Sequence, residues 1–110
     1  VEMICDGVHV DPRLVKAVSR VKKRQFIPIT DGCAATGMPG KRLAFPDPAG
    51  NVSEFDVRDG ALFIAGTDQL TGSLATMDKI FRNLVDFGAM TPGEARIFCS
   101  EVPRKKAGLL

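Results

Sequence analysis

Residues 3–31 read MICDGVHVDPRLVKAVSRVKKRQFIPITD, and this stretch decides the fold. Apolar residues run through Met3–Val10 and again through Gln25–Thr30, which predicts two strands. Between them, leucine and valine recur at helical spacing after Asp11, a capping residue, and Pro12, which suits a first helical turn. Strand, helix and strand in this order predict two parallel strands joined by a right-handed crossover.

A polar side chain stands at the end of each predicted strand. These are His9 and Asp31, 22 residues apart with the helix between them. In a parallel α/β barrel the strand ends at one face assemble the chemistry, so we expect both residues to point at the same site. Asp6 lies nearby, but regular strand pairing would turn its side chain away from His9.

Gly and Pro are frequent over residues 32–72, and no helical period appears there. Arg42–Phe45 and Glu54–Arg58 are typical of short strands, and Asp59-Gly60 predicts a hairpin leading into Ala61–Ile64. We therefore expect a small antiparallel β insertion of two or three strands. Pro28 removes a ladder donor, which predicts a bulge or an irregular second strand.

The helical period returns in the last third of the chain. An apolar stripe predicts one helix that ends at Gly88, and Thr91 with Glu94 predicts a capping box before a short final helix, Glu94–Ser100. The stripe consists of Leu74, Met77, Ile80, Phe81, Leu84 and Val85. We divide the chain into a strand-helix-strand unit of a barrel (1–31), a small β insertion with a substrate loop (32–72) and terminal barrel helices (73–110).

Composition bounds the class of protein. The chain has 110 residues, 45% of them hydrophobic, which suits one small domain, whereas a whole β/α barrel needs about 250 residues. The net charge of +2 and the lack of a long apolar stretch give no reason to expect nucleic acid or membrane as partners.

Three distant cysteines without a CxxC pattern favour reduced thiols and a cytoplasmic location. A first residue other than Met, with no visible signal peptide, suggests a processed chain or a fragment.

Each candidate site residue has a functional and a structural interpretation. Asp31 is either a general base and acid or an ordinary turn aspartate, and His9 is either a substrate contact or metal ligand or a satisfied histidine at a strand end. A lone histidine is weak support for a metal site. The segment 70–73, Leu-Thr-Gly-Ser, either offers helix N-terminal amides to an anion or sugar oxygen or simply begins a capped helix.

Four blocks in order carry a resemblance to a known family. They are CDGVHVDP (5–12), ITDGCAATGMP (29–39), VRDG (57–60) and GTDQLTGSLATMDKIFRNLV (66–85). Together they resemble the C-terminal part of N-acetylglucosamine-6-phosphate deacetylase, of the metal-dependent amidohydrolase superfamily. The resemblance implies the last β/α units of a TIM-like (β/α)8 barrel with a small antiparallel β insertion, and a substrate that is a phosphorylated amino sugar.

The resemblance also assigns roles. Asp31 matches the catalytic aspartate that takes a proton from a metal-bound water and returns it to the leaving amine. His9 matches a substrate-contacting histidine, and Leu70, Thr71 and Gly72 match a loop that lines the sugar, where the family more often has Ser in place of Thr. The divalent metal, zinc or a similar ion, is held in the family by a glutamate and two histidines that precede Val1. Two further implied partners are the remainder of the barrel and a second copy in a homodimer.

The sequence departs from the family at several positions, and these differences bear on whether the chain can be active. The phosphate-holding residues also precede Val1, Gly32 replaces a more usual Ala, and Val102-Pro103-Arg104 stands where the family has Asn-Pro-Ala. We therefore expect the isolated chain to be inactive and to bind metal weakly or not at all. Two alternatives stay open: a non-catalytic truncated module that only packs against other chains, and a deacetylase acting on N-acetylgalactosamine-6-phosphate.

Overall fold

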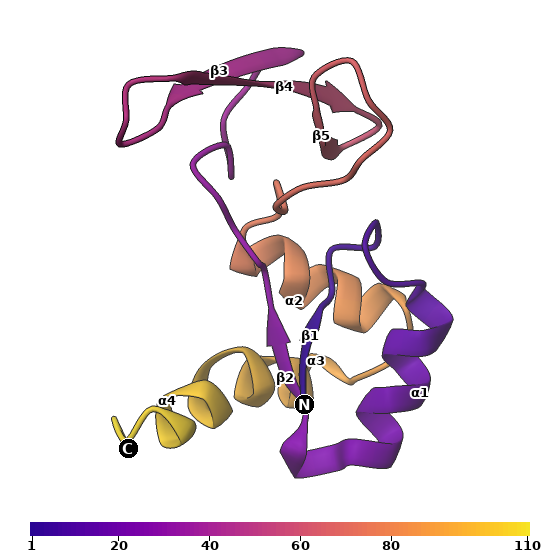
Figure 1. Ribbon diagram of the computed structural model, residues 1–110. Helices are drawn as coiled ribbons and strands as arrows, with labels where there is room; N and C mark the ends of the chain where they lie inside the picture. Colours follow the sequence, from indigo (N-terminus) through magenta and orange to yellow (C-terminus); the bar gives the residue numbers. More distant parts are fainter.

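The computed structural model describes residues 1–110, and the chain forms two small sheets of different kinds (Figure 1). β1 (Glu2–Ile4) and β2 (Ile27–Ile29) pair in parallel, with Met3 opposite Pro28. They are connected by α1 (Pro12–Lys22) and a turn of 3-10 helix over Lys23–Gln25. This confirms the predicted parallel strand-helix-strand unit.

The second sheet is antiparallel and has three strands in the order β3-β4-β5. Their bounds are β3 (Arg42–Pro46), β4 (Val52–Arg58) and β5 (Ala61–Ile64). Asp59 and Gly60, with φ of 51° and 76°, turn the chain between β4 and β5, as the Asp-Gly hairpin signal predicted. In Figure 1 this sheet stands at one end of the molecule, and the helices surround β1 and β2 at the other.

Three further helices follow the small sheet. They are α2 (Met77–Asp86), α3 (Pro92–Arg96) and α4 (Val102–Lys106). Apolar side chains of α1, α2 and α3 meet in one core with residues that lie just after β1, just before β2 and between α2 and α3. Its buried members are Cys5, Val15, Phe26, Ile80, Leu84, Met90 and Ala95.

The last helical stretch is longer than predicted and contains a wide turn. Thr91 and Glu94 form the predicted capping box. The helix runs past Ser100 through a π-helical segment, Ile97–Glu101, in which the N–H of Val102 bonds to the carbonyl of Ile97. Pro103 has no N–H to continue the ordinary i to i−4 ladder, so a local widening of the helix here has a plain cause.

Two predictions about the first strands are wrong. The first strand ends at Ile4 rather than Val10, because the chain turns sharply at Asp6-Gly7. Pro28 lies inside a regular β2 rather than in a bulge. Ile27 donates its N–H to Val1 and Ile29 accepts from Cys5, so alternation turns the backbone nitrogen of Pro28 to the open side of the strand, where no donor is needed.

Candidate functional site

β1 is followed by a tight turn built on the carboxylate of Asp6. Its Oδ1 accepts the backbone N–H groups of Val8 at 2.9 Å and His9 at 3.0 Å. Gly7 takes a φ of 83°, and a Cβ there would lie 3.3 Å from the ring of Phe87. Aspartate suits such a turn because its carboxylate satisfies N–H groups two and three residues ahead. The turn folds His9 back over Asp6.

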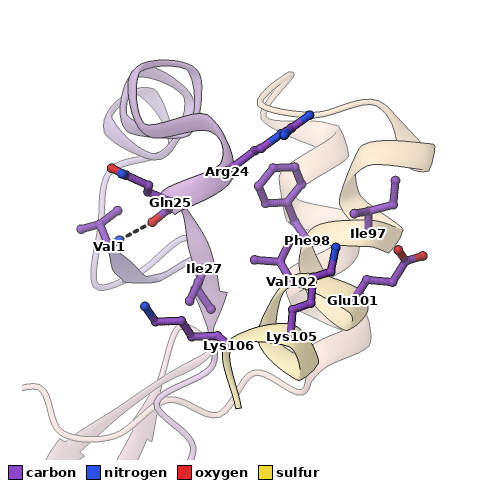
Figure 2. A pocket seen from close by; sticks show the side chains of 10 residues that line it. All are labelled: Val1, Arg24, Gln25, Ile27, Ile97, Phe98, Glu101, Val102, Lys105 and Lys106. Atoms are coloured by element: carbon purple, nitrogen blue, oxygen red, sulfur yellow. Dashed lines mark hydrogen bonds between the residues drawn. The ribbon is translucent and has the colours of Figure 1, made fainter. Parts of the chain in front are cut away.

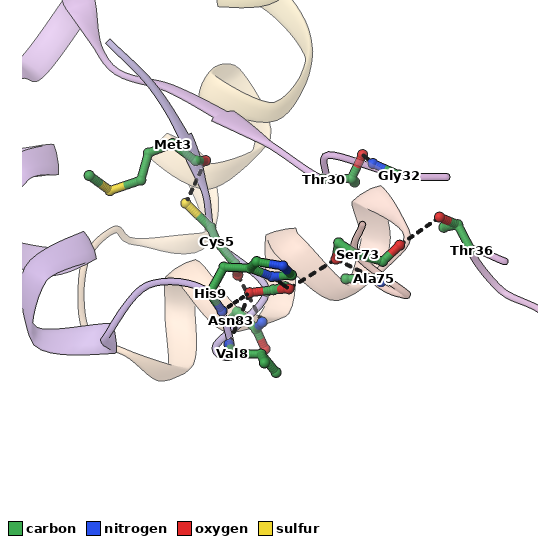
Figure 3. A network of polar contacts seen from close by, with 11 residues as sticks. Met3, Cys5, Val8, His9, Thr30, Gly32, Thr36, Ser73, Ala75 and Asn83 are labelled. Atoms are coloured by element: carbon green, nitrogen blue, oxygen red, sulfur yellow. Dashed lines mark hydrogen bonds and ion pairs between the residues drawn. The ribbon is translucent and has the colours of Figure 1, made fainter. Parts of the chain in front are cut away.

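The imidazole of His9 is bonded to the same carboxylate. Its Nδ1 lies 2.7 Å from Oδ2 of Asp6, and that oxygen also accepts the hydroxyl of Ser73 at 3.0 Å (Figure 3). The side chains of Asp6 and His9 are 5% and 17% exposed. The prediction that Asp6 faces away from His9 is therefore wrong, because strand alternation stops at Ile4.

Opposing effects act on the pKa of Asp6. Burial raises this pKa, but hydrogen bonds from the backbones of His9 and Val8 and from the side chains of His9 and Ser73 lower it more. The pKa of Asp6 is therefore below its usual value, and its carboxylate is ionised at neutral pH. An ionised carboxylate only accepts hydrogen bonds, so Nδ1 of His9 carries a proton and Nε2 is left for another partner.

We expect acid to weaken this turn. Because the pKa of Asp6 is lower in the folded chain, its stabilisation is present above the unfolded value of about 3.9 and is lost as the pH falls through the folded value. Urea unfolding of the wild type and Asp6→Asn should give free energies that converge as the pH falls from about 6 to about 2. A gap between them that does not change over this range would contradict the assignment.

Asp31 follows β2 and is exposed. Its backbone has a φ of 52°, a left-handed conformation that aspartate and asparagine tolerate better than most residues. None of the ion pairs in the chain includes its carboxylate. A free carboxylate at a strand end is available to exchange protons with a bound molecule.

Ser73 joins the ends of the two parallel strands. Its backbone N–H donates to the carbonyl of Asp31 at 2.9 Å, while its hydroxyl donates to Asp6. Gly32 and Ser73 pair as a parallel bridge beyond β2, and Ser73 is 1% exposed. The turn that holds His9 and the main chain of Asp31 are therefore both hydrogen-bonded to Ser73. No hydrogen bond joins the side chains of His9 and Asp31.

The predicted substrate loop, 70–73, connects the two sheets instead of beginning a helix. The N–H of Thr71 donates to Leu62 at 2.9 Å, and Leu70 bridges to Phe63, so the loop first runs along β5. It then passes Cys33 so closely that a Cβ on Gly72 would lie 2.8 Å from both Cβ and Sγ of that cysteine. The prediction of a helix N-terminus here is wrong, because α2 begins only at Met77.

Two hollows accompany these elements. One of about 210 Å³ lies between residues 33–35 and the small sheet and includes Thr71 of the loop among its lining residues. A larger groove of about 1000 Å³ is lined by Val1, Gln25 and helical residues from Ile97 to Lys106 (Figure 2). Val1 and Gln25 precede the strands, so this groove lies at their opposite ends and contains none of the predicted site residues.

The residues present do not form a metal centre. No group of three or more His, Cys, Asp and Glu side chains is placed to hold a metal ion. The sole histidine already has one ring nitrogen engaged by Asp6.

None of the helices combines the length and the apolar composition that crossing a membrane requires.

Sequence reasoning missed Asp6 and Ser73 as parts of the site. The signal for Asp6 was present, because Asp-Gly directly after an apolar run predicts a turn as readily as strand continuation. Ser73 had no such signal, because its partners lie 67 residues away at Asp6 and on the main chain at Asp31.

Sequence comparison supports the resemblance, although no family model matches the chain. The N-acetylglucosamine-6-phosphate deacetylase of Danio rerio is 28% identical over 107 residues, which is 97% of this chain and 25% of that protein. The N-acetylgalactosamine-6-phosphate deacetylase of Escherichia coli O157:H7 is 30% identical over 108 residues, 98% of this chain and 27% of that protein. The chain thus spans about a quarter of the length of these relatives.

Structural comparison agrees. The crystal structure of N-acetylglucosamine-6-phosphate deacetylase from Pasteurella multocida superposes with a TM-score of 0.82 at 27% identity, covering 98% of this chain and 27% of that one. The match confirms the mixed α/β architecture. The sequence relatives and structural neighbours of this chain are N-acetylated amino-sugar-6-phosphate deacetylases, hydrolases that it resembles over nearly its whole length.

Proposed function

We propose that this chain is part of an amidohydrolase that converts N-acetylglucosamine-6-phosphate and water to glucosamine-6-phosphate and acetate. The observation that carries the proposal is the exposed, unpaired carboxylate of Asp31 at the end of β2, tied through Ser73 to the turn that holds His9. In this proposal β1, α1 and β2 are among the last β/α units of a TIM-like barrel, whose remaining strands come from outside these residues.

Asp31 is the proton carrier of the proposed reaction. Its carboxylate takes a proton from the attacking water as the water oxygen bonds to the acetyl carbon. The same proton then passes to the sugar nitrogen as the carbon–nitrogen bond breaks, so that acetate and a free amine leave. Proton transfer by one positioned group in both directions requires a carboxylate that is not neutralised by a permanent partner, which is the state of Asp31.

The other predicted residues bind rather than react. His9 offers Nε2 to a substrate oxygen, because Nδ1 is engaged. Leu70, Thr71 and Gly72 line the sugar beside the 210 Å³ hollow.

We place the protein in the cytoplasm and propose that the complete enzyme works as a homodimer. The residues of this chain do not fit a metal, so any divalent ion of the complete enzyme depends on ligands elsewhere.

N-acetylgalactosamine-6-phosphate is the second candidate substrate. The relative that acts on it is 30% identical, against 28% for the glucosamine enzyme of Danio rerio, so similarity does not separate the two sugars. Acetate release should be assayed with both sugar phosphates. Native mass spectrometry of the purified material should come first, since it shows whether a further polypeptide accompanies the chain of 11.8 kDa. A lone chain that never yields activity with added barrel polypeptide would support the packing-module alternative.

We expect the 110-residue chain alone not to bind zinc tightly. Structural and catalytic zinc sites need three or four protein ligands, and no such group is assembled here. Equilibrium dialysis with zinc should leave less than stoichiometric metal on the chain, and His9→Gln should not alter the amount retained. Tight binding of one zinc ion per chain, lost in His9→Gln, would contradict this expectation.

A further inference from the structure

Asp6 takes no part in the proposed proton transfer, yet four hydrogen bonds converge on it. Oδ1 accepts the backbone N–H groups of Val8 and His9, and Oδ2 accepts Nδ1 of His9 and the hydroxyl of Ser73. Its side chain is 5% exposed, and it sits on the turn after β1. A carboxylate bound from both sides in this way has one fixed orientation.

We propose that Asp6 is a positioning residue that fixes the proton of the neutral His9 ring on Nδ1 and leaves the lone pair of Nε2 free to meet the substrate. In this state Nε2 accepts a hydrogen bond, so a hydroxyl group of the sugar is the substrate group that His9 recognises. The use of Nε2 rests on the proposed function. The position of the proton does not, because it follows from the contact between Nδ1 and Oδ2 of an ionised carboxylate, which can only accept a hydrogen bond.

The geometry also explains why the residue is aspartate and not asparagine. Two backbone N–H groups point at Oδ1, so an asparagine at this position would place its carbonyl oxygen there. Its NH2 group would then occupy the place of Oδ2, 2.7 Å from Nδ1 of His9, and would donate to that nitrogen. The ring proton would move to Nε2, which would change from acceptor to donor. A substitution of nearly equal size thus inverts the hydrogen-bonding character of His9.

Nitrogen NMR of the 110-residue chain tests this directly, because His9 is its only histidine. At a pH where the ring is neutral, Nε2 couples to both carbon-bound ring protons and Nδ1 mainly to one, which assigns each nitrogen. We expect Nδ1 protonated and Nε2 unprotonated in the wild type, and a complete exchange of the two in Asp6→Asn. A wild type in the Nε2–H form, or a folded Asp6→Asn that keeps the wild-type pattern, would overturn the proposal.

Two controls separate the effect from a general loosening. Asp47→Asn changes a carboxylate that accepts the N–H groups of Ala49 and Asn51 in the turn between β3 and β4, away from His9. Ser73→Ala removes the second donor to Oδ2 but keeps the carboxylate. Both should retain the Nδ1–H form. If Asp6→Asn does not fold, as judged by amide shift dispersion, the wild-type and Ser73→Ala patterns decide.

The outcome is independent of the deacetylase assignment. An Nδ1–H ring in a chain whose assembly releases no acetate from either sugar would leave Asp6 as a positioning residue and would refute the proposed function. An Nε2–H ring in an active assembly would refute the positioning role of Asp6 and would leave the proposed function in place.

Discussion

Asp31→Asn should lower acetate release by about 10²- to 10⁴-fold in an active assembly that contains this chain, the range typical of losing one general acid–base group. The change keeps the size of the side chain and, because asparagine also tolerates left-handed backbone, should preserve the φ of 52°. Only the ability to take and return a proton is lost. The loss should therefore fall on kcat, with little change in KM, when initial rates are measured over a range of sugar phosphate concentrations.

Asp59→Asn is the matched control. Asp59 is also exposed, has a φ of 51° and precedes a glycine, but it lies in the hairpin between β4 and β5. Its replacement should leave kcat unchanged. Equal rates for wild type and Asp31→Asn would remove Asp31 from the reaction and favour the packing-module alternative.

Gly72→Ala should destabilise the chain by about 1–3 kcal/mol, the usual cost of forcing an extra methyl group into a packed site. The new Cβ would lie 2.8 Å from both Cβ and Sγ of Cys33, closer than such atoms approach in folded proteins. Relief requires the loop to move from residues 31–33, which would strain the bond between the N–H of Ser73 and the carbonyl of Asp31. Urea unfolding monitored by circular dichroism measures the change.

A double-mutant cycle identifies the clash. Cys33→Gly removes both atoms that the new methyl group would meet, so Gly72→Ala should cost much less in that background than in the wild type. Gly93→Ala is the control, because a Cβ there meets nothing within 4 Å. If the losses of stability from Gly72→Ala and Cys33→Gly simply add in the double variant, Gly72 is sensitive for a reason other than contact with Cys33.

Local patterns predicted most of the elements. The helical period of α1, the Asp59-Gly60 hairpin and the capping box at Thr91 each depend on residues close in the chain, and all three are confirmed. The end of β1 was mispredicted because apolar Val8 and Val10 continue the strand pattern past the turn that Asp6 imposes. Competing local signals of similar strength are decided by contacts that a single sequence does not reveal.

The site was predictable only in part, for the same reason. The position of Asp31 just beyond β2 follows from the β-α-β pattern, whereas the position of His9, past the end of β1, depends on the turn at Asp6. Ser73 binds Asp6 and Asp31 through contacts across most of the chain, and the extended course of 70–73 depends on pairing with β5. A Gly-Ser pair before a helical stripe carries no mark of such partners, so the sequence predicts the start of a helix there.

The course of segment 69–73 has a consequence for how the chain opens. Its first residues are paired with β5 and its last with the end of β2, so the small sheet cannot separate from the parallel strands without breaking the bond at Thr71 or the bond at Ser73. The amide that keeps its partner when the sheets part stays protected, so hydrogen exchange at Thr71 and at Ser73 shows which sheet the segment follows.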